Sequence, residues 1–433
     1  MPLTSFYSAL SGLNNCALAI NVIGNNLANM NTTAFKSSKT SFAELLGGFG
    51  GTGIDGNPLQ VGLGSTVAGI TQILTQGSVA YTGRATDAAI NGNGYFVVQT
   101  PEGGQGFTRA GNFGLSSTGE LVNSVGFKVL GYRAVNGVID SSGGLSPVVI
   151  QSSTSMPPKA TTKIEFGANL DSQAAKDSTY ATSIQVYDSL GAAHTVTLTF
   201  KKLATPITGV PPIAQGSAWS FSATIPATDT TGGTASNPPV VIGQGSVTFD
   251  SNGVLTAPAK NAAIPPFTLP SGTFASGAAN ISVNFNVFDA NGTPRLTGFA
   301  STSTVSSSSQ NGYASSQLLG FAIDSDGVIT GSFNNGQSQP LAQLAIAIFP
   351  NAEGLQKFKD GTAVSFTSSG EPSIGTAGTG GRGTISGSAL EQSNVDIAQE
   401  FTNLIVAQRG YQANSRIITT TDELYQDAIN IKR

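Results

Sequence analysis

Apolar residues recur at alternating spacings of three and four at both ends of the 433-residue chain. This alternation is the heptad pattern of amphipathic helices that pack against other helices. It predicts one helix from about Leu3 to Leu27 and a second within residues 393–433. The predicted packing residues are Leu3, Phe6, Leu10, Leu13, Ile20 and Leu27 in the first helix, and Ile397, Phe401, Leu404, Tyr411, Ile418, Tyr425 and Ile429 in the second.

Between the two helical patterns, short apolar runs separated by turn residues predict β-strands. Pro157 and Pro158 mark one boundary in this region, and a serine-rich run ending near Gln310 marks another. We therefore predict a mainly β protein with terminal α-helices, in which an outer all-β domain is inserted into an inner one. The expected ranges are 77–165 with 309–389 for the inner domain, 166–308 for the outer domain, and 1–30 with 390–433 for a helical coiled-coil stem.

Residues 31–76 are predicted to form an extended connector with one hairpin or loop, and the glycine cluster at 47–58 argues against a regular element there. Three turns recur in the β region, as SSTGEL at 116–121, DSNGVL at 250–255 and DSDGVI at 324–329. In each, polar residues precede a glycine that can adopt positive φ, as in hairpin turns. A calcium loop is the alternative for DSDG, but the distal glutamate of that motif is missing.

Composition excludes several classes of partner. Only 10% of residues are charged and the net charge is −4, so no basic surface for nucleic acid or an anionic membrane is expected. No apolar run approaches the roughly 20 residues that span a bilayer. The amino terminus lacks the charged start and apolar core of a cleaved signal peptide, so export would need another route.

No catalytic, cofactor or metal site is expected, and the protein is not predicted to be an enzyme. His194 is the one histidine and Cys16 the one cysteine, so neither a zinc site nor a histidine-assisted triad can be assembled. His194 is expected to be an exposed or cross-strand residue, and Cys16 a small helix-packing residue. The glycine-rich segments at 91–95 and 378–384 lack the strand, helix and lysine context of a phosphate loop.

The first helix is also unusual in its polar face, because the range from Leu3 to Leu27 contains no Asp, Glu, Lys or Arg. A solvated helix normally carries charges on the face away from its core. We therefore expect further copies of the chain to cover these helices. The alternative is that the two terminal helices form an intramolecular hairpin that completes one core.

Several segments resemble one family. VIGNNLANMNTTAFK at 22–36 and the stretch from LEQSNV to the carboxyl end, 390–433, resemble the terminal signatures of bacterial flagellar rod and hook axial proteins. NGNGYFVV, FTRAGNFGLSSTGELVNSVGFKVLGY and LAIAIFPNAEGL resemble the inner β-domain of hook and distal-rod proteins. VYDSLGAAHTVTLTF at 186–200 resembles the outer domain found in hook proteins.

This resemblance implies a structural subunit of the bacterial flagellar hook, which polymerises into a curved, flexible tube and transmits torque from rod to filament as a universal joint. The implied partners are other copies of the chain, the distal rod protein, the hook cap, the hook–filament junction proteins and the flagellar type III export apparatus. The implied location is extracellular, in the hook and basal body. A distal rod protein of the same family and a secreted carbohydrate-binding β protein remain as alternatives.

Overall fold

The computed structural model describes residues 2–52, 58–135, 137–151, 155–204, 216–259, 264–269, 274–289, 291–359 and 361–431. The protein is mainly β with an α-helix near each end, which confirms the predicted fold class. The chain forms two compact units. Unit 1 contains residues 1–152, 319–332 and 338–433, and unit 2 contains residues 153–318 and 333–337. The domain ranges expected from the sequence stay a prediction.

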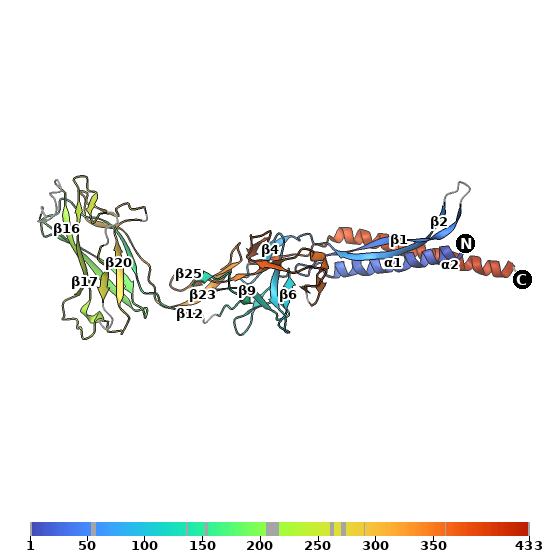
Figure 1. Ribbon diagram of the computed structural model, residues 1–433, viewed down its shortest axis with the longest axis horizontal. Coiled ribbons are helices and arrows are strands. Elements are labelled where there is room, and N and C mark those ends of the chain that lie inside the picture. The colour runs from blue at the N-terminus through green and yellow to red at the C-terminus, as the bar shows by residue number, and fades with distance from the viewer. Residues whose placement is uncertain are drawn as a thin grey trace. The chain divides into compact units, whose positions relative to one another are not determined.

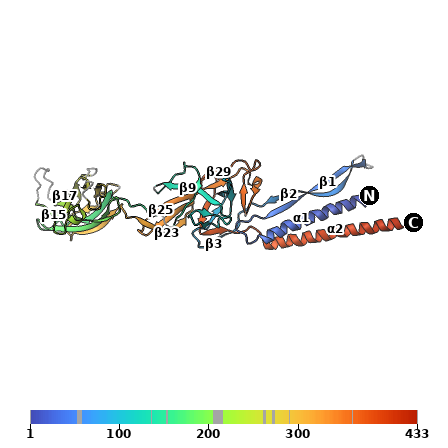
Figure 2. The ribbon, with the colours of Figure 1, turned by 90° about the horizontal axis from the view of Figure 1, so that it is seen from below.

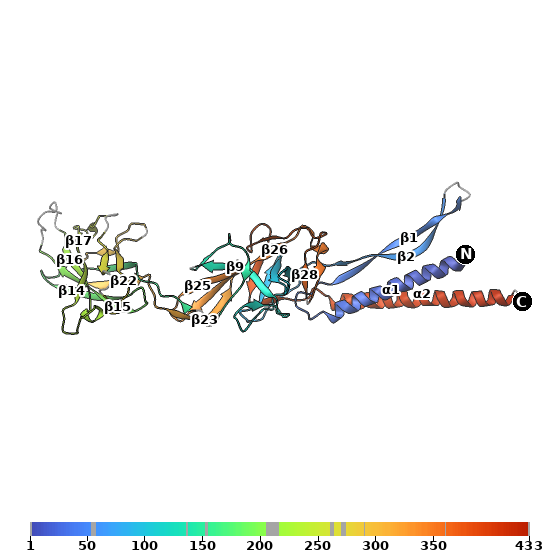
Figure 3. The same cartoon turned by 60° about the horizontal axis from the view of Figure 1, so that its bottom comes forward.

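Unit 1 contains the helices α1 (Pro2–Ala28) and α2 (Ile397–Ile431). The carboxylate of Asp396 accepts hydrogen bonds from the N–H groups of Ala398 and Gln399, and so caps the first turn of α2. The two helices lie side by side in antiparallel orientation, with the chain termini toward the same end (Figures 1 and 3). Within the described ranges, neither helix combines the length and apolar character needed to cross a bilayer.

A long antiparallel hairpin follows α1 and is formed by β1 (Ser38–Thr52) and β2 (Pro58–Gln72). The hairpin runs alongside α1 (Figure 2). Because β1 continues to Thr52, the expectation that the glycine cluster excludes a regular element was wrong. The pairing register shifts several times beyond Ser41, so bulges accommodate a segment that does not fit a regular ladder.

The β body of unit 1 is built on short antiparallel strands. A continuous series of pairs runs β24-β25-β9-β5-β6-β28-β27. Its buried core contains Val97, Phe107, Leu130, Tyr132, Ala345 and Ala347. The strands are β3 (Val79–Tyr81), β4 (Ala88–Asn91), β5 (Tyr95–Gln99), β6 (Gln105–Thr108), β7 (Gly114–Leu115), β8 (Leu121–Val122), β9 (Lys128–Val135), β10 (Val138–Ile139), β11 (Ser146–Pro147), β23 (Ser316–Ile323), β24 (Val328–Phe333), β25 (Ser338–Leu344), β26 (Ile346–Ile348), β27 (Gln356–Lys357), β28 (Thr362–Val364), β29 (Ser373–Gly375), β30 (Thr384–Gly387) and β31 (Ala389–Glu391).

Two small strand pairs bring the carboxyl-terminal part of unit 1 back to its amino-terminal part. β3 pairs with β31, with Val79 opposite Glu391, and β4 pairs with β30, with Ile90 opposite Ile385. The strands that precede α2 are therefore anchored on the strands that follow the long hairpin. This pairing places Glu391, five residues before the Asp396 cap, against the segment that leaves β2.

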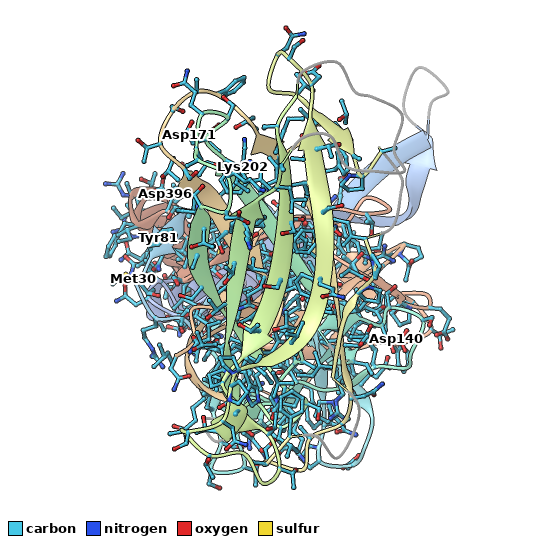
Figure 4. The ribbon with its side chains drawn as sticks, turned by 90° about the vertical axis from the view of Figure 1, so that its left-hand side faces the viewer. Met30, Tyr81, Asp140, Asp171, Lys202 and Asp396 are labelled. Atoms are coloured by element: carbon cyan, nitrogen blue, oxygen red, sulfur yellow. The ribbon has the colours of Figure 1, made fainter. Side chains whose placement is uncertain are left out.

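The described residues of unit 2 form two sheets. One is antiparallel in the order β14-β15-β16-β17-β18, and it faces the viewer in Figure 4. In the other, β19-β20-β13-β21, β13 is parallel to β20 and β21 and antiparallel to β22. The strands are β12 (Ser155–Met156), β13 (Lys163–Asn169), β14 (Thr179–Tyr187), β15 (Ala193–Lys202), β16 (Ala218–Ile225), β17 (Val240–Phe249), β18 (Leu255–Ala257), β19 (Phe267–Leu269), β20 (Ile281–Asn286), β21 (Leu296–Thr297) and β22 (Thr304–Gln310).

The core of unit 2 is one aromatic-rich cluster drawn from both sheets. Phe166 stacks on Phe200 with ring centroids 5.8 Å apart, and Phe221 and Phe285 complete the layer. Alternate residues along β15 and β16 are buried, as expected for strands that cover a core with one face. The Lys202 ammonium covers one end of this core and lies 5.1 Å from the centroid of the Trp219 ring. Lys202 and Asp171 are labelled in Figure 4.

The hairpin-turn interpretation of the recurring motifs is confirmed. Asp250 accepts the backbone N–H groups of Asn252 and Val254, and Asp324 does the same for Asp326 and Val328. The glycines that follow, Gly253 and Gly327, both have a φ of 76°. The carboxylates of these turns therefore bind the protein's own backbone.

Candidate functional site

Small and polar residues join α1 to α2. A Cβ atom added at Gly12 would meet Nδ2 of Asn414 at 2.8 Å, and one added at Gly410 would meet Sγ of Cys16 at 3.1 Å. Nearer the start of α2, Asn26 Nδ2 donates to Glu400 Oε1 at 3.3 Å. Burial raises the pKa of Glu400, although the Asn26 hydrogen bond opposes the shift. The two backbones approach closely because Gly12 and Gly410 carry no side chain.

Buried amide side chains fix α1 to the hairpin. Asn15 Nδ2 donates to the carbonyl oxygen of Ser65 at 2.8 Å and to its hydroxyl at 2.7 Å. Asn26 donates to the carbonyl of Ser38 at 2.8 Å and accepts the N–H of Ser38 at 3.0 Å. Because both amides are buried and bonded in specific directions, they fix the register between helix and hairpin.

The predicted packing residues lie largely outside these contacts. With 100° of rotation per residue, Leu13 lies about 160° around α1 from Asn15, and so points away from the hairpin. Half-buried among the predicted residues are Phe6, Leu13, Ile20, Leu27, Leu404, Ile418 and Tyr425. Exposed are Leu10, Ile397, Phe401, Tyr411 and Ile429, with 38% of Leu10 and 52% of Phe401 accessible. The side chain of Leu3 lies outside the described residues. Their role in assembly stays a prediction.

An open groove of about 920 Å³ runs between α1, α2 and the hairpin. Its walls are built mostly from small and polar side chains, among them Gly12, Asn15, Ala19, Ser65, Asn403 and Ala407. Larger apolar side chains also line the groove, namely Val22, Ile23, Phe42, Ile73 and Val406. The groove therefore combines small, polar and apolar side chains, and Val406 belongs both to it and to the exposed apolar residues of α2.

A buried ionic junction connects the helices to the β body of unit 1. The Glu391 carboxylate is buried, pairs through Oε1 with Lys36 Nζ, and accepts the N–H of Gly77 at 3.0 Å. Its Oε2 lies 3.2 Å from Arg109 Nε. Arg109 also donates through Nη1 to the carbonyls of Gly92 and Gly94 at 2.8 and 2.7 Å. One carboxylate therefore joins four distant parts of the chain.

Burial lowers the pKa of Lys36, while the hydrogen bond and charge of Glu391 act in the opposite direction. This junction was not predicted from the sequence, because Lys36, Arg109 and Glu391 are separated by up to 355 positions. They do occur in three of the segments that carry the family resemblance, AFK, FTRAGNF and LEQSNV. In a chain with so few charges, a charged residue inside each such segment was the available signal.

His194 is buried and lies opposite Val186 across the β14–β15 pair, so the cross-strand alternative is confirmed and the exposed one is not. Its Nδ1 lies 3.0 Å from Asp229 Oδ2, and its Nε2 lies 3.3 Å from Asp188 Oδ2. The ring packs against that of Phe274, with centroids 4.5 Å apart and the planes tilted by 37°. His194 therefore ties β15 to two loops of unit 2. Cys16 takes part in the contact between α1 and α2.

Four family models match successive parts of the chain. They are described as flagella basal body rod protein for residues 6–36, flagellar hook protein FlgE/F/G D1 domain for 89–169, flagellar basal body protein FlaE D2 domain for 152–313, and flagellar basal body rod FlgEFG protein C-terminal for 386–431. Both helices, much of the β body of unit 1 and nearly all of unit 2 are thus matched by flagellar models.

Full-length relatives give the same result. The flagellar hook protein FlgE of Treponema pallidum is 34% identical over 99% of this chain and 99% of its own length. The flagellar hook protein FlgE of Escherichia coli is 34% identical over 99% of this chain and 100% of its own length. The crystal structure of Helicobacter pylori flagellar hook protein FlgE2 shares the fold, with a TM-score of 0.53 at 15% identity over 72% of this chain and 100% of that one.

These relatives favour neither the distal rod protein nor the carbohydrate-binding alternative. They are hook proteins matched from end to end, and their terminal signatures coincide here with α1, α2 and the ionic junction. The chain belongs to the flagellar hook protein FlgE family.

Proposed function

We propose that this protein is a structural subunit of the flagellar hook that polymerises through its terminal helices into a curved, flexible tube. The observation that carries the proposal is the exposure of large apolar side chains along α1 and α2. Small and polar residues make the closest contacts between α1 and α2, while Leu10, Phe401 and Ile429 remain accessible. Neighbouring copies would cover them.

The energetics favour covering these residues. Fully burying one Leu, Ile or Phe side chain stabilises by about 1.5–3 kcal/mol. A helix pair that meets neighbours on several faces gains this term at several positions, so many weak contacts add up to a strong assembly. A head-to-tail contact whose rotation does not close generates an open helical tube rather than a ring.

We propose further that the tube works as a universal joint that transmits torque from rod to filament. The helices would form the firm inner contacts. The β surfaces, poor in charge and rich in Ser, Thr and Asn, would exchange hydrogen bonds with water or a neighbour at little net cost. The distal rod protein, hook cap and hook–filament junction proteins are the proposed partners. The protein would leave the cell through the flagellar type III apparatus and act outside it.

The proposal is tested by placing a charge on the exposed apolar face. Phe401→Asp and Leu10→Asp are each expected to raise the critical concentration for tube formation at least about tenfold, since each removes roughly 1.5 kcal/mol or more per contact. Electron microscopy and sedimentation of the purified full-length chain measure this. Thr402→Asp is the matched control, because it adds the same charge one residue away at another exposed position of α2.

Unit 2 should keep its fold in all three variants, as judged by the fluorescence of Trp219, the chain's one tryptophan, which lies in the core of that unit. Tubes that form as readily from Phe401→Asp and Leu10→Asp as from the unsubstituted chain would contradict the proposed role of these residues. A chain that remains monomeric at every concentration would contradict the proposed polymerisation itself.

A further inference from the structure

We propose that a cavity beside the ionic junction of unit 1 binds a small oxyanion, a carboxylate or a phosphate. The cavity has a volume of about 310 Å³ and is lined by Lys36, Asn93, Gly94, Tyr95, Arg109 and Ala352, together with neighbouring residues. Since one water molecule occupies about 30 Å³ of liquid, the cavity has room for such an anion and several waters.

The charges around this cavity do not balance. Lys36 and Arg109 are both more than nine-tenths buried, and both pair with the single carboxylate of Glu391. Among the described residues that line the cavity, Lys36 and Arg109 are the charged ones. One net positive charge therefore remains in a partly desolvated place, where an uncompensated ion is costly. An anion in the cavity would neutralise it.

Arg109 retains donor capacity toward such a ligand. A guanidinium has five N–H groups. In the described part of the chain, its Nη1 donates to two backbone carbonyls and its Nε faces Glu391, which leaves the Nη2 amino group. Arg109 also lies 6.0 Å from the centroid of the Tyr95 ring, and Tyr95 lines the same cavity.

The fold brings two glycine-rich segments to the cavity. Gly94 belongs to NGNGY and Gly381 to GTGGRGT, and both line it. Backbone N–H of Gly383 donates to the carbonyl of Asn93 at 2.7 Å, which holds the two segments together. A Cβ built at Gly381 would meet nothing within 4 Å, so an anion can approach the backbone at that position. Phe349 and Pro350 form an apolar wall that strengthens electrostatic attraction by reducing contact with water.

Two sources could supply this anion, a free oxyanion in solution or a carboxylate of a neighbouring copy. The first test uses the monomeric full-length chain, with acetate and inorganic phosphate as probes at constant ionic strength. A saturable change in the amide NMR signals of Gly94 and Tyr95, with a rise in melting temperature, is expected. Absence of saturable binding of either probe would overturn the proposal.

Substituting Lys36 or Arg109 would disturb the Glu391 junction, so the variants are made at the partly buried Ala352. Ala352→Glu supplies a tethered carboxylate and is expected to raise the melting temperature and weaken acetate binding about tenfold or more. Ala352→Gln fills nearly the same space without charge and is expected to weaken binding less and not raise the melting temperature. Equal effects of the two variants would also overturn the proposal.

The second test identifies the source and rests on the proposed polymerisation, whereas the monomer test does not. If a neighbouring copy supplies the carboxylate, assembled tubes lose acetate binding and Ala352→Glu assembles less readily than Ala352→Gln. If the anion is free, tubes bind acetate as the monomer does and the two variants assemble alike. Either outcome supports the site, while failure to form tubes bears only on the proposed function.

Discussion

The β-sandwich of unit 2 and the helix pair of unit 1 both carry regular patterns of large apolar residues, but they use them differently. In the sandwich, Phe200 and Trp219 are almost fully buried by the chain itself. In the helix pair, Phe401 and Ile429 are more than half exposed, and the contacts between elements fall to residues such as Gly12 and Asn15. The sandwich is complete within one copy, whereas the helix pair leaves its apolar face open.

This difference shows that an amphipathic pattern identifies a surface without identifying what covers it. Two stacked sheets can bury both of their inner faces in one unit. Two helices can bury only a narrow stripe of each other, and here their closest approach is at small and polar residues such as Gly12 and Asn414. The apolar residues that stay exposed are those that, in our proposal, further copies of the chain cover.

The largest loss of stability is expected from removing a buried aromatic ring from the core of the unit 2 sandwich. Phe200→Ala removes a fully buried ring and should lower the free energy of unfolding of unit 2 by about 3–5 kcal/mol. Urea unfolding followed by Trp219 fluorescence measures it, because that residue belongs to the same core. Leu190→Ala, at a side chain that is 61% exposed, is the control and should change stability by about 0.5 kcal/mol or less. Equal losses of stability in the two variants would mean that Phe200 is not buried in the core of unit 2.

A smaller effect distinguishes the contact stripe from the open face of α1. Ala at a helix-interior Gly position stabilises by up to about 1 kcal/mol. Gly24→Ala should show this gain, since an added Cβ meets nothing within 4 Å. Gly12→Ala should show less of it, or a loss, because the new Cβ would displace Asn414. Amide hydrogen exchange of α1 measures both. Equal protection in the two variants would contradict the close approach of α1 and α2.

The smallest effect concerns the turns that edge the sandwich. The backbone N–H groups of Thr293 and Asn291 donate to Asp289 and hold the pKa of its carboxyl below the ordinary value. A lowered folded-state pKa gives stability that is present above the unfolded-state pKa of about 3.9 and is lost as pH falls through the folded-state value.

Asp289→Asn keeps an acceptor oxygen but cannot titrate. Its stability should therefore fall less steeply than that of the unsubstituted chain as the pH is lowered from 6 to about 2. Unfolding curves at several pH values, again read from Trp219, compare the two. Asp289→Ala should be less stable than the unsubstituted chain at every pH above the folded-state pKa of Asp289, because no acceptor remains for the two backbone N–H groups. Parallel pH profiles for the Asn variant and the unsubstituted chain would exclude a contribution from this carboxylate.

Much of the fold could be predicted from the sequence because it follows local periodicity. The heptad spacing indicated both helices, and Asp-x-x-Gly segments such as Asp324–Gly327 indicated hairpin turns. The glycine cluster led to a wrong prediction of irregular structure, because β1 accommodates its glycines by shifts in pairing register and does not end at them. Local composition does not record whether a partner strand is bulged.

The contacts of the candidate site were not predictable in the same way. The heptad pattern is defined by large apolar residues. It therefore does not identify Gly12, Cys16 or Gly410, which contribute to the helix contact because they are small. The meeting of Lys36 with Glu391 depends on the pairing of β3 with β31, which no local pattern encodes. Likewise, the surroundings of His194 come from Asp229, which lies 35 residues further along the chain.

The position of Glu391 near the carboxyl end has a consequence for how the molecule matures. A chain that emerges amino terminus first exposes Lys36 before its counter-ion, which lies 355 positions further along. We therefore expect the joint between helices and β body to lock only after residue 391 has emerged. A fragment that ends before Glu391 would lack the residue that secures this joint, so synthesis as far as this carboxylate is a condition for a firm building block.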